Sequence, residues 1–194
     1  MNTQTTRQTT RTLVVLALCY AFQMAGFVMI SPLFARLFES FGSGVRALGM
    51  SAMAYALAGT VAAPFMGLLA DRLGRRPIIL ISLAAYVVAF SGYLLATSAW
   101  LLILLRGLAG LFTAGLVPAI LSSVGDLAPE NGRARWIGIV NGGASAGWVV
   151  GPYIGGLLYD NFGYIVPLAA SIVLELSAFL LALFLIPETC PPLT

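Results

Sequence analysis

The sequence contains no lysine and no histidine, and its ten cationic residues are all arginines. Only 9% of the 194 residues are charged, whereas a soluble domain has about 25%. Most of the surface therefore does not face water. The net charge of +3 is small, and no basic stripe with interleaved aromatic residues exists. These absences argue against a soluble protein and against a nucleic-acid partner.

Cysteine is scarce as well. Cys19 lies within an apolar stretch and Cys190 in the C-terminal tail, so neither a disulfide framework nor a metal site is predicted. The segment from Gly143 to Gly147, centred on Ser145, matches a nucleophile elbow, but that motif needs a strand-to-helix turn and a histidine base. The sequence therefore predicts no enzyme, no metal and no cofactor.

Long hydrophobic runs are abundant, because 60% of the residues are hydrophobic and the mean hydropathy is +0.97. Crossing a bilayer takes about 20 apolar residues, and six stretches qualify. These runs are continuous and too long for the strands of a β-barrel. We expect an all-α membrane protein in the lipid bilayer, with six transmembrane helices. The predicted spans are Leu13–Phe34, Ala47–Ala70, Pro77–Thr97, Trp100–Val124, Trp136–Tyr159 and Tyr164–Ile186.

The arginines between these spans predict the orientation. Seven lie on the side of the N-terminus and only two, Arg36 and Arg46, on the other side. Because cytoplasmic loops are enriched in arginine, we expect both termini in the cytoplasm, at the cell (inner or plasma) membrane. Residues 1–12 and 188–194 are then cytoplasmic tails, and residues 13–187 form the transmembrane bundle.

Two similar segments end the second and the fifth span. Gly67-Leu-Leu-Ala-Asp71-Arg-Leu-Gly74 and Gly156-Leu-Leu-Tyr-Asp160-Asn-Phe-Gly163 lie about half the chain apart. They predict two copies of a three-helix unit, residues 13–97 and 100–187. Since three is odd, the second copy is inserted upside down, as in secondary transporters. The alternative is that both segments are common helix endings.

The most specific segment is the loop after the second span, whose defined positions are Gly67, Asp71, Arg72, Gly74, Arg75 and Arg76. It resembles the loop signature of the major facilitator superfamily, G-x-x-x-D-R-x-G-R-[RK]. In that family, the loop is thought to latch the two halves of a transporter in the outward-facing state, with its acidic residue facing the other half. A cluster of arginines that only sets the topology is the alternative.

Two charged residues lie inside the spans, Arg106 and Glu175. The segment from Arg106 to Gly115 resembles the family's fourth-helix motif, whose arginine is associated with proton coupling. A buried arginine needs a cavity or an anionic partner, unless it reaches outward to the interface. Glu175 lies near the bilayer centre, where it either carries a coupled proton or is simply protonated and hydrogen-bonded.

The fifth span contains Gly147-Trp-Val-Val-Gly151-Pro152-Tyr-Ile-Gly155-Gly156, which resembles the G-x-x-x-G-P-x-x-G-G motif of proton-driven drug exporters. The alternative is a packing face unrelated to transport direction. The preceding loop, with Asp126 and Arg133, resembles the family's cytoplasmic link, and we expect Asp126 to pair with Arg72. Asn131-Gly132-Arg133 departs from the usual order, in which arginine precedes glycine. Candidate residues that line a cavity are Gln23, Met24, Phe27 and Asn141, although core packing explains the first three equally well.

The resemblance covers nearly the whole chain and implies a secondary transporter that exchanges protons for small amphiphilic or drug-like compounds by alternating access. A sugar or metabolite porter of the same family and a non-transporting membrane scaffold or sensor are the alternatives. The family's working unit has twelve helices. We therefore expect a second six-helix half as a partner, either the missing half of a truncated chain or a second copy.

Overall fold

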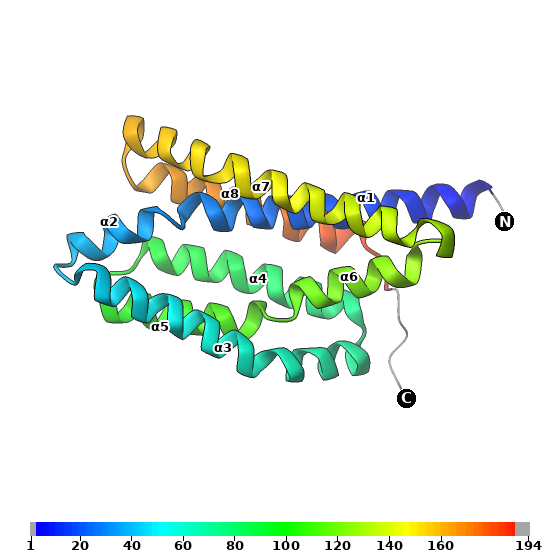
Figure 1. Ribbon diagram of the computed structural model, residues 1–194, viewed down its shortest axis with the longest axis horizontal. Coiled ribbons are helices and arrows are strands. Elements are labelled where there is room, and N and C mark those ends of the chain that lie inside the picture. The colour runs from blue at the N-terminus through cyan, green and yellow to red at the C-terminus, as the bar shows by residue number, and fades with distance from the viewer. Residues whose placement is uncertain (1–2, 189–194) are drawn as a thin grey trace.

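The computed structural model describes residues 3–188, which form helices and connecting turns. The helices are α1 (Thr3–Ile30), α2 (Leu33–Ser40), α3 (Gly44–Leu73), α4 (Arg75–Leu94), α5 (Ala99–Thr113), α6 (Leu116–Leu127), the 3₁₀ turn η1 (Glu130–Gly132), α7 (Arg133–Phe162) and α8 (Ile165–Leu185). The helices run roughly along one long axis, as a bundle (Figure 1).

Five helical stretches among the described residues are long and apolar enough to cross a membrane. They are Arg7–Ser40, Gly44–Leu73, Arg75–Leu94, Ala99–Leu127 and Ile165–Leu185. The sixth predicted span lies in α7, which has 30 residues, as many as α3, but is rich in glycine. The chain is thus an integral membrane protein with an all-helical fold.

Two predicted spans are broken, where the sequence analysis expected continuous helices. The first span divides at Ser31–Pro32, since proline lacks the amide hydrogen that would continue α1. The fourth divides at Ala114–Gly115. There Pro118 cannot donate a hydrogen bond to the carbonyl of Ala114, four residues earlier, so the helix restarts as α6. The predicted N-terminal tail is also helical, since α1 begins at Thr3, ten residues before the predicted span.

The two halves of the sequence form an inverted repeat, as predicted. α3 and α7 correspond, and each ends one residue before a glycine with positive φ, Gly74 at 95° and Gly163 at 76°. The most extensive helix contacts are α1 with α7 and α3 with α5. These two pairs are equivalent under the repeat, because α1 corresponds to the span of α5 and α6.

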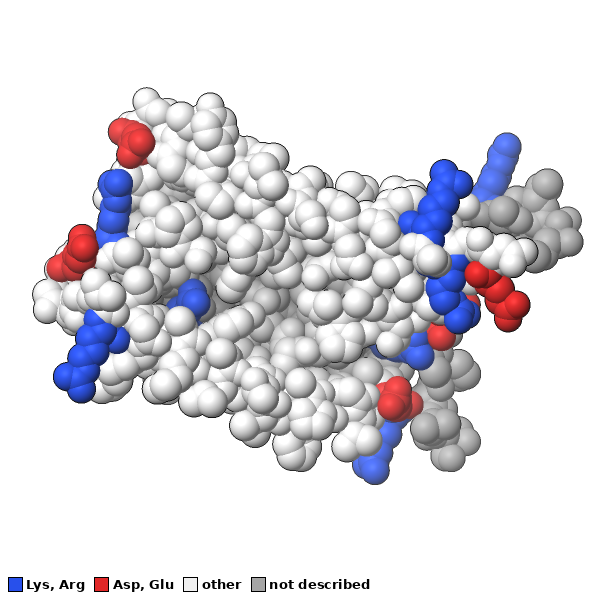
Figure 2. All heavy atoms as spheres, viewed as in Figure 1, with Lys and Arg blue, Asp and Glu red and all other residues white. Residues whose placement is uncertain are grey.

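The repeat places α1, α7 and α8 on one side of the bundle and α3 and α5 on the other, with α4 between them (Figure 1). Both described chain ends lie at the end that also holds the α3–α4 and α6–α7 connections (Figure 1). Charged side chains gather at the two ends of the bundle, and its middle is almost free of them (Figure 2). This distribution matches an apolar band between two polar surfaces.

Candidate functional site

Arg106 lies inside the bundle on α5, with only 8% of its surface exposed. Its guanidinium carbon stands 4.3 Å from the ring centre of Phe34 on α2 and 5.5 Å from that of Tyr55 on α3. Within residues 3–188, Arg106 forms no salt bridge. Aromatic faces therefore take the place of the anionic partner that the sequence analysis considered. Burial at this level places the guanidinium among protein side chains, and the alternative in which Arg106 reaches outward to the interface stays open.

Hydroxyl groups that the sequence analysis missed lie next to this arginine. The hydroxyl of Tyr55 is 3.0 Å from that of Tyr86 on α4 and 3.4 Å from that of Thr113 on α5. Thr113 in turn donates to the carbonyl of Ala109 at 2.7 Å. The ring of Phe27 packs on both tyrosines, with ring centres 5.6 and 6.2 Å away. These residues join α1, α3, α4 and α5 around Arg106.

A cavity of about 290 Å³ opens beside these hydroxyls, between α3 and α5. Its lining includes Tyr55, Gly59, Thr60, Gly110 and Thr113. It combines three hydroxyl-bearing side chains, Tyr55, Thr60 and Thr113, with a wall of glycine and alanine. A tyrosine in a helix rich in alanine and glycine is the sequence signal that could have pointed to this site.

Glu175 is fully buried on α8, and neither carboxyl oxygen has a hydrogen-bond partner among the described residues. Its Oε1 lies only 3.1 Å from the position that a Cβ atom on Gly26 would occupy, so the missing side chain of Gly26 makes room for the carboxyl. The prediction that Glu175 is either a proton carrier or a hydrogen-bonded acid stays open. The structure supplies no hydrogen bond for the second alternative.

Gln23 is also buried, and its amide has no hydrogen-bond partner among the described residues. It shares one face of α1 with Cys19 and Gly26, four residues before and three after it. Cys19 donates to the carbonyl of Ala178 on α8, and Gly26 contacts Glu175. Gln23 therefore lies on the α8 side of α1, near Glu175.

Tyr86 connects the two buried charges. It is hydrogen-bonded to Tyr55 beside Arg106, and it lies close enough to Glu175 for an electrostatic interaction. Arg106, Tyr55, Tyr86 and Glu175 thus form a row of polar side chains inside the apolar band, here called the polar path, in which no hydrogen bond joins Tyr86 to Glu175. Arg106 and Glu175 were predicted from the sequence, whereas Tyr55 and Tyr86 were not.

The remaining candidate cavity residues are spread out. Phe27 belongs to the aromatic cluster around Tyr55. Met24 is half-buried, and its sulfur accepts a hydrogen bond from Trp148 on α7 at 3.1 Å. Asn141 is exposed on α7. The four residues therefore do not line one cavity as a group.

The glycine motif of α7 lies against α1. Atoms of the α1 backbone approach the glycines so closely that a Cβ on Gly147 would stand 2.8 Å from the Ala21 carbonyl oxygen, and one on Gly151 would stand 2.9 Å from that of Ala25. Gly155 meets the carbonyl of Met29 in the same way. Gly156 faces open space, and α7 continues through Pro152 as one helix.

The loop between α3 and α4 has an inner and an outer part. Arg75 forms a salt bridge with Asp126 at 2.5 Å. Asp126 therefore pairs with Arg75 and not with Arg72, the partner that the sequence had predicted. Arg76 donates to the Leu183 carbonyl at the end of α8, at 2.8 Å. The reason is that Gly74 turns the chain, and α4 starts at Arg75 facing α6 and α8.

The outer part of the loop consists of Asp71 and Arg72, which are exposed. A Cβ atom on Gly67 would have no other atom within 4 Å, so no neighbouring helix packs against Gly67 among the described residues. Arg133 is exposed at the start of α7 and forms no salt bridge there. These residues remain available to a neighbour.

A family model described as Major Facilitator Superfamily matches residues 16–193. The chain belongs to the major facilitator superfamily. Its curated relatives include the class E tetracycline resistance protein of Escherichia coli, 32% identical over 91% of this chain and 44% of that protein. The class G tetracycline resistance protein of Vibrio anguillarum is 38% identical over 70% of this chain and 34% of that protein.

A solved structure of the superfamily shares the fold. The human organic anion transporter MFSD10 superimposes with a TM-score of 0.82 at 21% identity, covering 94% of this chain and 49% of the human one. The chain thus spans less than half the length of these relatives. The family and the helical fold are established by these matches, as the sequence motifs predicted.

Proposed function

We propose that this chain forms one half of a secondary active transporter that exports small amphiphilic or drug-like compounds in exchange for protons. The superfamily membership supports transport as the activity, and relatives named for tetracycline resistance support a drug-like substrate. The observation that carries the proposal is the polar path from Arg106 to Glu175. Ionisable groups inside a membrane span mark substrate or proton pathways.

Arg106 and its aromatic neighbours form the substrate end of this path. A cation held over Phe34 and Tyr55 keeps its hydrogen-bonding groups available, since the rings use none of them. The adjoining cavity offers an apolar wall with the Tyr55 and Thr113 hydroxyls. An amphiphilic molecule with a few polar groups suits such a lining.

Glu175 forms the proton end. A carboxyl that is buried without a hydrogen-bond partner is tolerated only as the neutral acid, because an unpaired charge there is very costly. Losing the proton therefore requires α1 and α8 to separate, so that water or a cation reaches the carboxylate. We propose that protonation closes this contact and deprotonation opens it, which links the proton to the conformation.

The partner in alternating access is a second six-helix half. α3 and α7 present large apolar side chains to the outside, including Leu57, Val61 and Phe65 on α3 and Trp148 and Tyr153 on α7. In our proposal, Asp71 and Arg72 complete the latch by facing that half, while Arg75 and Arg76 fasten the loop to this one. Residues 13–187 are then the working bundle, with both termini in the cytoplasm. The glycine face of α7 belongs to the export machinery.

The proposal can be tested in proteoliposomes that contain the complete gene product and tetracycline. The wild type should move tetracycline faster when a pH gradient is imposed. Glu175→Gln, which removes the exchangeable proton, should reduce the gradient effect about 5- to 150-fold, the usual range for coupling between two sites. Arg106→Leu should weaken tetracycline binding, and Arg106→Lys should restore part of it.

Ser177→Ala is the matched control on α8, because its hydroxyl bonds only within its own helix, to the Val173 carbonyl. It should transport like the wild type. Transport by the wild type that ignores the pH gradient would contradict proton coupling. A normal gradient response in Glu175→Gln would show that Glu175 does not carry the coupled proton, and the proposed transport function would stand without it.

A further inference from the structure

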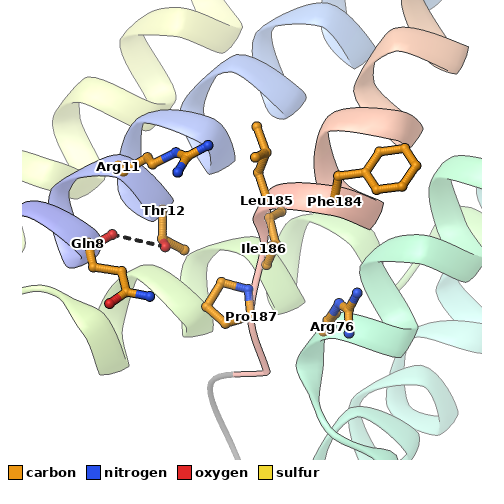
Figure 3. Close-up of a pocket in the computed structure, with 8 residues that line it drawn as sticks. All are labelled: Gln8, Arg11, Thr12, Arg76, Phe184, Leu185, Ile186 and Pro187. Carbon is orange, nitrogen blue, oxygen red and sulfur yellow. Dashed lines mark hydrogen bonds between the residues drawn. The ribbon is translucent and has the colours of Figure 1, made fainter.

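A pocket that plays no part in the transport path lies at the arginine-rich end of the bundle. It has a volume of about 380 Å³ and lies between the start of α1, the start of α4 and the end of α8 (Figure 3). Its lining residues are Gln8, Arg11, Thr12, Arg76, Phe184, Leu185, Ile186 and Pro187. Binding sites for small molecules start at about 300 Å³, so the pocket is large enough for a lipid headgroup.

Two arginines from different helices supply the charge of this pocket. Arg11 projects from α1 toward the end of α8, and Arg76 lies across from it at the start of α4 (Figure 3). Neither forms a salt bridge among residues 3–188. Arg76 uses one Nη2 hydrogen bond to hold the Leu183 carbonyl, and its buried Nε has no partner there. Guanidinium groups bind phosphate oxygens through paired hydrogen bonds.

No acidic side chain is among the residues that line the pocket. The Thr12 hydroxyl donates to the carbonyl of Gln8 at 3.2 Å, within its own helix. Glu188, the acidic residue that follows the pocket, directs its Oε1 to the backbone amide of Arg75 at 2.9 Å. The charged side chains that line the pocket, Arg11 and Arg76, are both positive.

The position of the pocket selects the kind of anion. Arg11 and Arg76 stand just before the apolar stretches that the sequence predicts from Leu13 and Pro77, and Pro187 stands just after α8, which ends at Leu185, so the pocket lies at the membrane boundary. Phe184 lies in the last turn of α8 and is 76% exposed, so it extends the pocket toward the apolar band. Basic pockets between transmembrane helices on the cytoplasmic side are suited to anionic lipid headgroups.

We propose that this pocket binds the phosphodiester headgroup of an anionic phospholipid, with Arg11 and Arg76 on the phosphate and one acyl chain along Phe184. Free phosphate could bind the same two arginines, but it has no acyl chain to contact Phe184. The site would tie the lipid to the inner part of the α3–α4 loop, through Arg76. Its test needs no transport measurement and is independent of the proposed function.

A tryptophan reporter can measure the site in vesicles. The reporter is Phe184→Trp in the complete gene product, in which every other tryptophan, including Trp100, Trp136 and Trp148, is changed to phenylalanine. Brominated phosphatidylglycerol in phosphatidylcholine vesicles should quench it more strongly than brominated phosphatidylcholine. Arg11→Gln should reduce the preference for phosphatidylglycerol about fivefold, and Arg76→Gln by a similar factor. Arg11→Lys should retain most of it.

Arg135→Gln is the matched control, because it removes an exposed arginine from the same end without touching the pocket. It should keep the preference. Among the described residues, Arg11 makes no hydrogen bond to another helix, and circular dichroism should confirm that its variant is folded. Equal quenching by both lipids, or an equal loss in Arg135→Gln, would overturn the proposal. So would displacement of phosphatidylglycerol by inorganic phosphate but not by sodium chloride of equal ionic strength.

Discussion

The contacts α1–α7 and α3–α5 occupy equivalent places in the inverted repeat but are built differently. In α1–α7, Gly147, Gly151 and Gly155 bring the two backbones together over three successive turns. In α3–α5 the close approach is concentrated at Gly110, which meets the carbonyl of Tyr55. Beside it lie Tyr55, Arg106 and Thr113. One contact is thus devoted to packing, while its counterpart carries the polar groups of the candidate site.

This difference shows what duplication permits in a membrane bundle. Close contacts between small residues supply much of the association energy of helices in lipid, where no hydrophobic force drives them together. Once α1–α7 fixes one pair, the equivalent pair can accommodate side chains and a cavity. The two contacts can be separated experimentally by adding methyl groups to one or the other.

The largest losses of stability are expected where a glycine touches the backbone of a neighbouring helix, and the first case is α1–α7. A Cβ at Gly155 would overlap the Met29 carbonyl, which belongs to the backbone and cannot rotate away. Gly155→Ala should therefore lower the free energy of unfolding by about 1–3 kcal/mol, measured by denaturant titration in mixed micelles. Gly156→Ala is the control at the next residue, where no atom lies within 4 Å. It should be neutral or gain up to about 1 kcal/mol from helix propensity. Equal losses in both would disprove the packing role of Gly155.

A similar loss of stability is expected in α3–α5, because a Cβ at Gly110 would meet the Tyr55 carbonyl at least as closely as one at Gly155 would meet that of Met29. Gly110→Ala should therefore also lower the free energy of unfolding by about 1–3 kcal/mol. It should also displace Tyr55 and so impair tetracycline transport more than Gly155→Ala does at equal folded fraction. Gly107→Ala is the control, since its Cβ would meet Ala54 at an ordinary 3.8 Å. If Gly110→Ala transports normally, the two contacts do not differ in function.

The sequence predicted much of the architecture because its signals are local. Apolar length located the spans, and the glycine spacing of α7 indicated a packing face four residues apart. The two similar helix endings predicted the inverted repeat. Even the break at Pro32 follows from the lack of an amide hydrogen, although the first span was predicted to be continuous.

The candidate site was only half predictable, because it depends on how each helix is rotated about its axis. Arg106 and Glu175 are conspicuous as charges, but Tyr55 and Tyr86 meet only through tertiary packing, 31 residues apart. The room for Glu175 comes from Gly26 on another helix, which no local pattern links to it. Arg72 and Arg75 are similar candidates in the sequence. The turn at Gly74 is what presents Arg75 to Asp126.

The smallest expected effect concerns the hydroxyl pair that makes α3–α5 chemically distinct. Tyr55→Phe removes the hydroxyl that lies 3.0 Å from the Tyr86 hydroxyl, and should lower the free energy of unfolding by about 1 kcal/mol. Tyr86→Phe should cost a similar amount. If the two hydroxyls bond mainly to each other, the double variant should cost less than the sum of the single ones, and a double-mutant cycle measures that difference. Additive losses would show that Tyr55 and Tyr86 act independently, and the polar path from Arg106 to Glu175 would then be interrupted at its middle.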